Sequence, residues 1–167
     1  MQEINHLIIA IMYKVSFADD FKKVERFNNK VTKVTLKGKI NDVFGEGLCI
    51  PSNIINWMEN NSGEIKLDYI KVSGVSVKNG KDTYDPVLGE RLAEARAKLK
   101  IYKYMKTFCC KMLQYYAAKV FGITDAKSFT VNKVIMDCNN SLIEAYKKYC
   151  HLIEVENTHI KQLLYDY

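Results

Sequence analysis

Apolar side chains recur every three or four residues along residues 81–122, and this spacing predicts one long helix. Asp85 is placed to accept hydrogen bonds from the unpaired N–H groups of the first turn, and Pro86 suits the first helical position. Gly122 marks the end of the helix, where a left-handed residue is favoured. The shared apolar face consists of Leu88, Leu92, Ala95, Leu99, Tyr102, Met105, Cys109, Met112, Tyr116 and Val120.

The same periodicity predicts a second long helix after a short connection, with Ser128 or Thr130 as its cap. Because only a few residues separate them, the two helices, 85–121 and 130–165, are expected to fold back as an antiparallel hairpin. The expected inward positions of the second helix are Val131, Val134, Ile135, Cys138, Leu142, Ala145, Tyr149, Leu152, Val155, His159, Ile160 and Leu163.

The first 80 residues contain two stretches in which apolar and polar positions alternate, as in half-buried antiparallel strands. In residues 30–41, Val34, Leu36 and Ile40 share one side. In residues 64–77 the alternation is interrupted at Gly74, where we expect a β-bulge.

Shorter segments of this half predict helices. Ser16 begins a candidate helix that turns Phe17, Phe21 and Val24 inward and stops at Asn28-Asn29. A helical turn beginning at Ser52 gathers Ile54, Ile55, Trp57 and Met58. Residues 6–15 fit either a buried strand or a short helix, and periodicity does not decide between them.

These elements predict an α+β fold in one domain, 1–167, with a small antiparallel sheet and short helices in 1–80 and a C-terminal antiparallel pair of long helices. The chain has 167 residues, 48% of them apolar, which allows a real core. Its five cysteines form no CxxC pair, which favours free thiols in a reducing compartment. Leu7 to Met12 is too short to span a bilayer and lacks the flanks of a secretory signal, so we expect a cytoplasmic protein with no membrane partner.

Charge adds a candidate binding surface, because the net charge of +6 is concentrated partly on the central helix. Basic side chains there can neutralise phosphates, and a neighbouring tyrosine can stack on unpaired bases. A solvated helix exterior explains the same pattern about equally well. Strand lysines 33, 37, 39, 66 and 71 add positive charge, for which protection of sheet edges is an equal explanation. The residues predicted for the contact are Arg91, Arg96, Lys100, Lys103, Tyr104 and Lys111.

Nothing in the sequence indicates catalysis, a cofactor or a metal ion. His6, His151 and His159 lack metal-ligand spacing, and the glycines from Gly45 onward do not form a phosphate-binding loop. The acidic residues near the start of the central helix are explained by capping and by the helix dipole. Apolar and tyrosine positions beyond those of the hairpin seam either pack on the sheet or form a partner or dimer interface: Ile101, Tyr104, Phe108, Phe121, Tyr146, Tyr165 and Tyr167.

Residues 72–100 resemble a segment of small accessory proteins of bacteriophages and prophages, in which a strand and turn precede D-x-[Y/F]-D-x-x-x-G-x-x-x-A-x-A-R-A and a helix. The matching residues are Asp82, Tyr84, Asp85, Gly89, Ala93, Ala95, Arg96 and Ala97. In physical terms the segment combines a capped turn, a glycine for close approach of helix and strand, and alanines where helix meets sheet. The resemblance implies a protein that acts on host machinery or host defence.

The leading hypothesis is therefore a non-enzymatic phage or mobile-element accessory protein in the host cytoplasm, which inhibits a host defence nucleoprotein through its basic helix face. The expected partner is a host protein or nucleoprotein, or its nucleic acid. Two alternatives remain: an oligomeric sponge for an anionic nucleotide signal, and a structural protein that forms homodimers or larger oligomers through its long helices.

Overall fold

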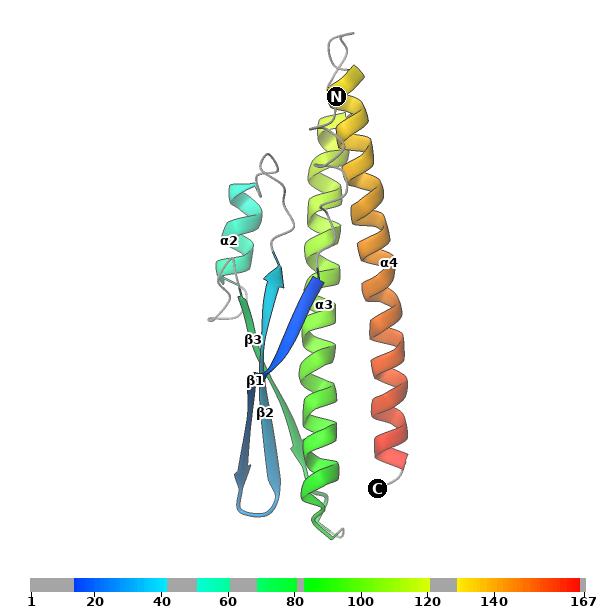
Figure 1. Cartoon of the computed structure of the whole chain (residues 1–167). Helices are drawn as coiled ribbons and strands as arrows, with labels where there is room; N and C mark the ends of the chain where they lie inside the picture. The colour runs from blue at the N-terminus through cyan, green and yellow to red at the C-terminus, as the bar shows by residue number, and fades with distance from the viewer. Residues whose placement is uncertain (1–13, 42–50, 61–68, 81–82, 121–128, 166–167) are drawn as a thin grey trace.

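A computed structural model describes residues 14–41, 51–60, 69–80, 83–120 and 129–165 of the chain (Figure 1). The fold is α+β, as predicted, with three antiparallel strands in the order β1-β2-β3. The elements are β1 (Lys14–Phe27), β2 (Val31–Asn41), α2 (Ser52–Asn60), β3 (Tyr69–Val77), α3 (Pro86–Val120) and α4 (Phe129–Tyr165).

Helix α3 is the centre of the molecule and lies between the sheet and α4 (Figure 1). It packs on β2 and β3 on one side and along α4 on the other. Helix α2 contacts α3 as well, next to Tyr104 and Lys111. The helices α3 and α4 run antiparallel, which confirms the predicted hairpin. Because α3 is covered on more than one side, Ile101 and Phe108, which the hairpin seam alone did not require, are buried in the core.

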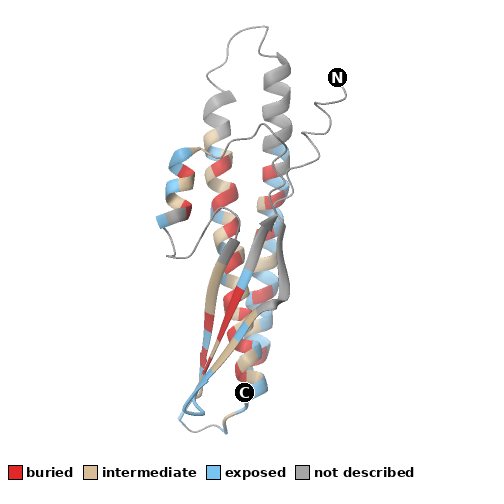
Figure 2. Ribbon diagram, turned by 60° about the vertical axis from the view of Figure 1, so that its left-hand side comes forward, coloured by how far each residue is buried: buried red, intermediate tan, exposed pale blue. Residues whose placement is uncertain are grey.

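The main hydrophobic cluster spans these layers, and its buried residues follow α3 and the middle of β2 (Figure 2). A smaller, separate cluster joins α3 to the end of α4. Val34 and Leu36 are buried where β2 faces α3, as the alternation predicted. From α2, Ile54 and Met58 join the same cluster, which confirms the predicted helical turn and extends it to nine residues. From α4 the cluster includes Leu142, Ala145 and Tyr149.

The helix predicted to begin at Ser16 is wrong, because residues 14–27 form strand β1. Alternation governs the second half of this segment, where β1 pairs in register with β2 from Lys22–Leu36 to Phe27–Val31. Asn28 and Asn29 have φ of 51° and 52°, and Lys30 N–H donates to Phe27 O at 3.1 Å. Asparagine tolerates this left-handed conformation, so the pair makes the turn of a hairpin instead of ending a helix.

The bulge predicted at Gly74 is also wrong, because β3 pairs with β2 without a shift, Gly74 opposite Val34. The glycine serves close packing instead. A Cβ built at Gly74 would lie 1.9 Å from Ala93 O and 2.6 Å from Ala97 N. The backbones of β3 and α3 are therefore in direct contact at this point.

The inward side of α4 differs from the prediction in its last third. Val155 and His159 are exposed, and Glu156 is buried in their place. Steps of three and four residues from Leu152 reach Glu156 and Leu163, so the face of α4 that packs on α3 includes Glu156 and leaves out Val155 and His159. His159 Nδ1 lies 3.1 Å from Glu156 Oε1, which gives the buried carboxylate a polar partner.

Several predicted features fall outside the described residues. They include most of 6–15, the Gly45 loop, residues 64–68, Asp82, Phe121, Gly122, Ser128 and Tyr167. Thr130, the other candidate cap, already lies inside α4. Among the helices that the structure describes, none combines the length and apolar character that crossing a membrane requires.

Candidate functional site

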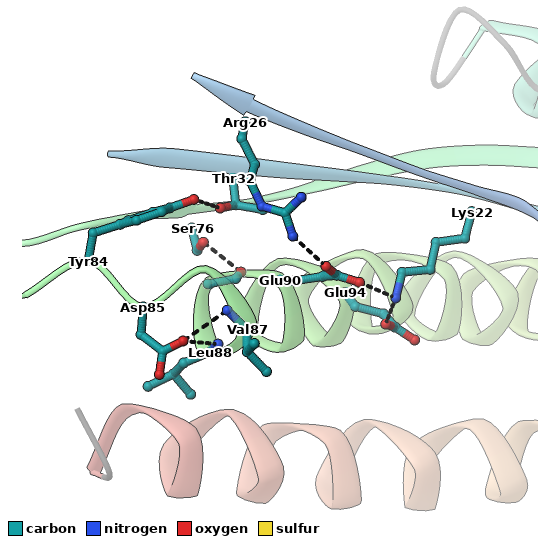
Figure 3. A network of polar contacts seen from close by, with 11 residues as sticks. Lys22, Arg26, Thr32, Ser76, Tyr84, Asp85, Val87, Leu88, Glu90 and Glu94 are labelled. Atoms are coloured by element: carbon teal, nitrogen blue, oxygen red, sulfur yellow. Dashed lines mark hydrogen bonds and ion pairs between the residues drawn. The ribbon is translucent and has the colours of Figure 1, made fainter. Parts of the chain in front are cut away.

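The start of α3 is fixed to the sheet by contacts of Tyr84 and Gly89, and the Tyr84 hydroxyl lies 3.1 Å from Thr32 Oγ1 (Figure 3). Asp85 Oδ1 accepts hydrogen bonds from the N–H groups of Val87 (2.9 Å) and Leu88 (3.1 Å), which confirms the predicted cap. Ser76 Oγ donates to Gly89 O at 2.7 Å. Gly89 thus lies directly against the sheet, as expected for a glycine that permits close approach of helix and strand.

Ion pairs attach β1 to the same helix (Figure 3). Lys22 Nζ lies 2.7 Å from Glu90 Oε1 and 2.7 Å from Glu94 Oε2, and Arg26 donates to Glu90 at 2.8 Å. Hydrogen bonds to Glu90 and Glu94 raise the pKa of Lys22. Burial opposes ionisation of Glu94, but hydrogen bonds from Lys22 and Lys98 outweigh it and lower the pKa of Glu94. These acidic residues are therefore occupied in holding the sheet.

Two of the predicted contact residues, Arg96 and Lys100, are used at the outer edge of β3. Arg96 donates to Val75 O at 2.7 Å, and Lys100 donates to Ser73 O at 2.6 Å. Both carbonyls belong to an edge strand, and neither points toward β2 in the observed register. The two side chains cap the edge with positive charge, which is one way in which proteins protect an exposed strand.

Tyr104 and Lys111 lie elsewhere, beside Trp57 of α2. The rings of Tyr104 and Trp57 stack with centroids 5.0 Å apart and an interplanar angle of 10°. Lys111 Nζ lies 5.2 Å from the centroid of the Trp57 ring. Burial raises the pKa of Tyr104, whose hydroxyl has no hydrogen-bond partner among the described residues. The cluster therefore attaches α2 to α3, and one face of the Tyr104 ring is covered.

Arg91 and Lys103 are exposed on α3. The six predicted residues therefore divide among the edge of β3, the Trp57 cluster and the solvent-exposed surface of α3. Lys100 also borders a hollow in the surface.

That hollow lies mostly on the face of the sheet that points away from α3, here called the open face, and it extends past the outer edge of β3 to Val72 and Lys100. Side chains of Lys22, Thr32 and Ser76 contact α3 or the segment before it, so the alternate positions point to the other side. Among the described elements, α3 is the helix that packs on the sheet. The open face consists of Lys23, Glu25, Phe27, Val31, Lys33, Thr35, Lys37, Lys71, Ser73, Val75 and Val77.

A shallow cleft of about 610 Å³ occupies part of the open face and reaches Lys100. Thr35 Oγ1 and Ser73 Oγ are hydrogen bonded across it at 2.9 Å. We call this site the lysine cleft, because four lysines and one glutamate leave an excess of three positive charges. Its lining residues are Lys23, Glu25, Lys33, Thr35, Lys71, Val72, Ser73 and Lys100.

The lysines of the cleft act on its one lining carboxylate, Glu25, and lower the pKa of that group. Lys23 Nζ lies 2.8 Å from Glu25 Oε1, and Lys33 Nζ lies 4.0 Å from Glu25 Oε2. The hydrogen bond from Lys23, with the charges of Lys23, Lys33 and Lys71, lowers the pKa of Glu25. A second anion entering the cleft would be attracted by the same lysines.

Sequence reasoning found part of this site and missed the rest. Lys33 and Lys71 were recognised as basic strand residues, and the alternation of β2 and β3 places them on one face. Lys23 and Glu25 were missed because residues 16–29 resemble a helix in their pattern. The signal that could have found them is the short alternation from Lys22 to Phe27, followed by two asparagines.

The residues of the lysine cleft are suited to binding an anion: ammonium groups and two hydroxyls can contact phosphate oxygens. Within the described residues, no group of three or more His, Cys, Asp or Glu side chains is placed to hold a metal ion. The thiols of Cys109, Cys110 and Cys150 are free, and burial raises the pKa of Cys109 to about 12.

No protein-family model matches this chain, and neither a curated protein nor a solved structure matches it. The function is therefore inferred from the geometry of the open face.

Proposed function

We propose that this protein is a non-enzymatic phage or mobile-element accessory protein that inhibits a host defence nucleoprotein by binding its nucleic acid through the lysine cleft. The observation that carries the proposal is the convergence of four lysines from three strands and α3 around one cleft. The phage origin is supported by the resemblance of residues 72–100 alone.

We place the contact with nucleic acid on the sheet and not on the basic face of α3, because the lysines of the sheet surround one cleft. The predicted helix residues are dispersed, with Arg96 at the edge of β3 and Tyr104 against Trp57, whereas the lysine cleft gathers four lysines around one hollow. Phosphate groups bound by lysines release counterions, so binding of this kind weakens steeply as salt rises. Lys100 belongs both to the predicted helix face and to the cleft.

Purification from a bacterial host at low salt, followed by size-exclusion chromatography with light scattering and absorbance, tests the proposal. We expect nucleic acid to co-elute with the protein and to dissociate as salt is raised. The variant carrying Lys33→Glu and Lys71→Glu should elute without it. The variant carrying Lys148→Glu and Lys161→Glu, both exposed on α4 across α3 from the sheet, is the matched control and should behave as the native chain. Co-elution that survives the double reversal would reject the cleft as the binding site.

A second candidate is a sponge for an anionic nucleotide, favoured by the volume of the cleft and by the hydroxyls of Thr35 and Ser73. A ligand that binds only the folded state raises its melting temperature. Cyclic nucleotides should then stabilise the native chain and leave the Lys33→Glu, Lys71→Glu variant unchanged. Absence of any stabilisation would eliminate the sponge.

A further inference from the structure

The open face has two chemically different halves. Away from the hairpin turn lies the lysine cleft. At the hairpin end, Phe27, Val31 and Val77 form one row across the three strands, since Phe27 pairs with Val31 and Val31 with Val77. The next row contains Glu25, Lys33 and Val75. Apolar and basic positions therefore adjoin on the same surface.

Two residues of the apolar row, Phe27 and Val77, are exposed to solvent, and so is Val75 of the next row, whereas Val31 is half-buried. Phe27 is 49% exposed, Val75 40% and Val77 64%. Figure 2 shows the exposed residues gathered around the hairpin end of the sheet. An aromatic ring that is half exposed on a sheet surface, bordered by valines, offers a π-face to a partner.

We infer that the open face binds single-stranded nucleic acid in preference to duplex, with a base stacked on Phe27 and the backbone phosphates on the lysine cleft. This inference rests on the proposed function and specifies its ligand. Bases within a duplex are covered by their neighbours in the stack, so only an unpaired base can place its π-face on an aromatic side chain.

Distances along the sheet are compatible with one continuous strand of nucleic acid. Phe27 and Lys23 are four residues apart on β1, which corresponds to roughly 13 Å in an extended strand. Lys33 lies between them, in the row of Glu25. Going from Phe27 toward Lys71 a ligand first meets apolar surface and then meets ammonium groups, which matches the base and the phosphates of a nucleotide chain.

Fluorescence anisotropy with a short oligodeoxythymidylate, the corresponding oligouridylate and matching duplexes tests the inference. We expect the single strands to bind more tightly than the duplexes. Phe27→Ala and Phe27→Leu should each weaken single-strand binding about five- to a hundredfold, the range for loss of one stacked base. Leucine keeps the apolar bulk, so its failure to restore affinity separates stacking from structural support, and Phe27→Trp should retain binding.

Leu164→Ala is the matched control, because Leu164 is 48% exposed and lies on α4, away from the sheet. It should leave affinity unchanged. Equal affinity for single strand and duplex, or native affinity of Phe27→Leu, would overturn the inference. If the Lys33→Glu, Lys71→Glu variant still loses binding in that case, the proposed function survives. If none of the oligonucleotides binds the native chain, both fail.

Discussion

Gly74 shows most directly how a single residue sets the distance between the sheet and α3. A side chain there would meet backbone atoms of Ala93 and Ala97, which cannot move independently of the helix. We expect Gly74→Ala to lower the free energy of unfolding by at least about 2 kcal/mol, measured by denaturant titration. Gly80→Ala is the matched control, since a Cβ at Gly80 has no described atom within 4 Å. Equal stability of the two variants would contradict the close contact.

At this scale, residues whose role is local were predictable and those whose role depends on a distant partner were not. The cap at Asp85 follows from its position before Pro86, and the structure confirms it. Gly74 suggested a bulge because a glycine inside a strand commonly marks one, and its real partner, Ala93, lies on another element. The position of Tyr104 beside lysines predicts that it stacks on a base, but in the structure it stacks on Trp57, which depends on how α2 packs.

Among the elements, the attachment of β1 to α3 depends on pH in a definite direction. The pKa of Glu94 is lowered from 4.5, so its contribution to stability is present above that value and is lost as pH falls through the lower folded-state pKa. The pKa of Lys22 is raised from 10.5, so its contribution is present below that value and is lost as pH rises through the higher one.

Thermal unfolding across pH tests this attachment. The native chain should lose stability as pH falls below 4.5, and Glu94→Gln should be less stable at neutral pH but show a smaller further loss in acid. Glu144→Gln, at an exposed site on α4, is the matched control. If the melting temperatures of the native chain and of Glu94→Gln fell by the same amount in acid, Glu94 would not stabilise the attachment of β1 to α3.

The edge of β3 provides a second prediction about an element. Arg96→Ala removes the donor to Val75 O and uncovers part of the edge strand, so we expect increased self-association at high protein concentration. Light scattering measures it. Arg91→Ala removes the same charge from an exposed position on α3 and should leave the mass unchanged. Identical masses for both variants would mean that Arg96 does not protect the edge.

The elements themselves were predicted to the extent that their patterns were unambiguous. The long helices and strand β2 have sustained periodicity, and the structure confirms them. The pattern of strand β1 imitates a helix because Ser16 suits a helix cap and the apolar residues after it fit one helix face, whereas pairing with β2 decides its conformation. The burial of Ile101 on α3 requires knowing that the helix is covered on two sides.

In the whole molecule, α3 separates two surfaces with different properties. The sheet presents its lysine cleft and the Phe27 row on one side, and α4 presents the other, where Ile143, Val155 and Leu164 are exposed. Because several elements pack on α3, its basic residues are dispersed over the edge of β3, the Trp57 cluster and the exposed surface of the helix. Positive charge counted along one helix therefore does not predict the lysine cleft, because only the sheet topology brings Lys23, Lys33 and Lys71 together.

The central claim, that the open face and not the outer surface of α3 binds the anionic partner, is tested most directly by the salt dependence of oligonucleotide binding in two charge-reversed variants. Lys33→Glu should lower affinity and reduce the slope of log K against log salt by about 0.7 for each phosphate that the protein no longer neutralises. Lys103→Glu makes the same charge change on exposed α3 and should leave the slope nearly unchanged. A slope reduced by Lys103→Glu and unaffected by Lys33→Glu would contradict the account.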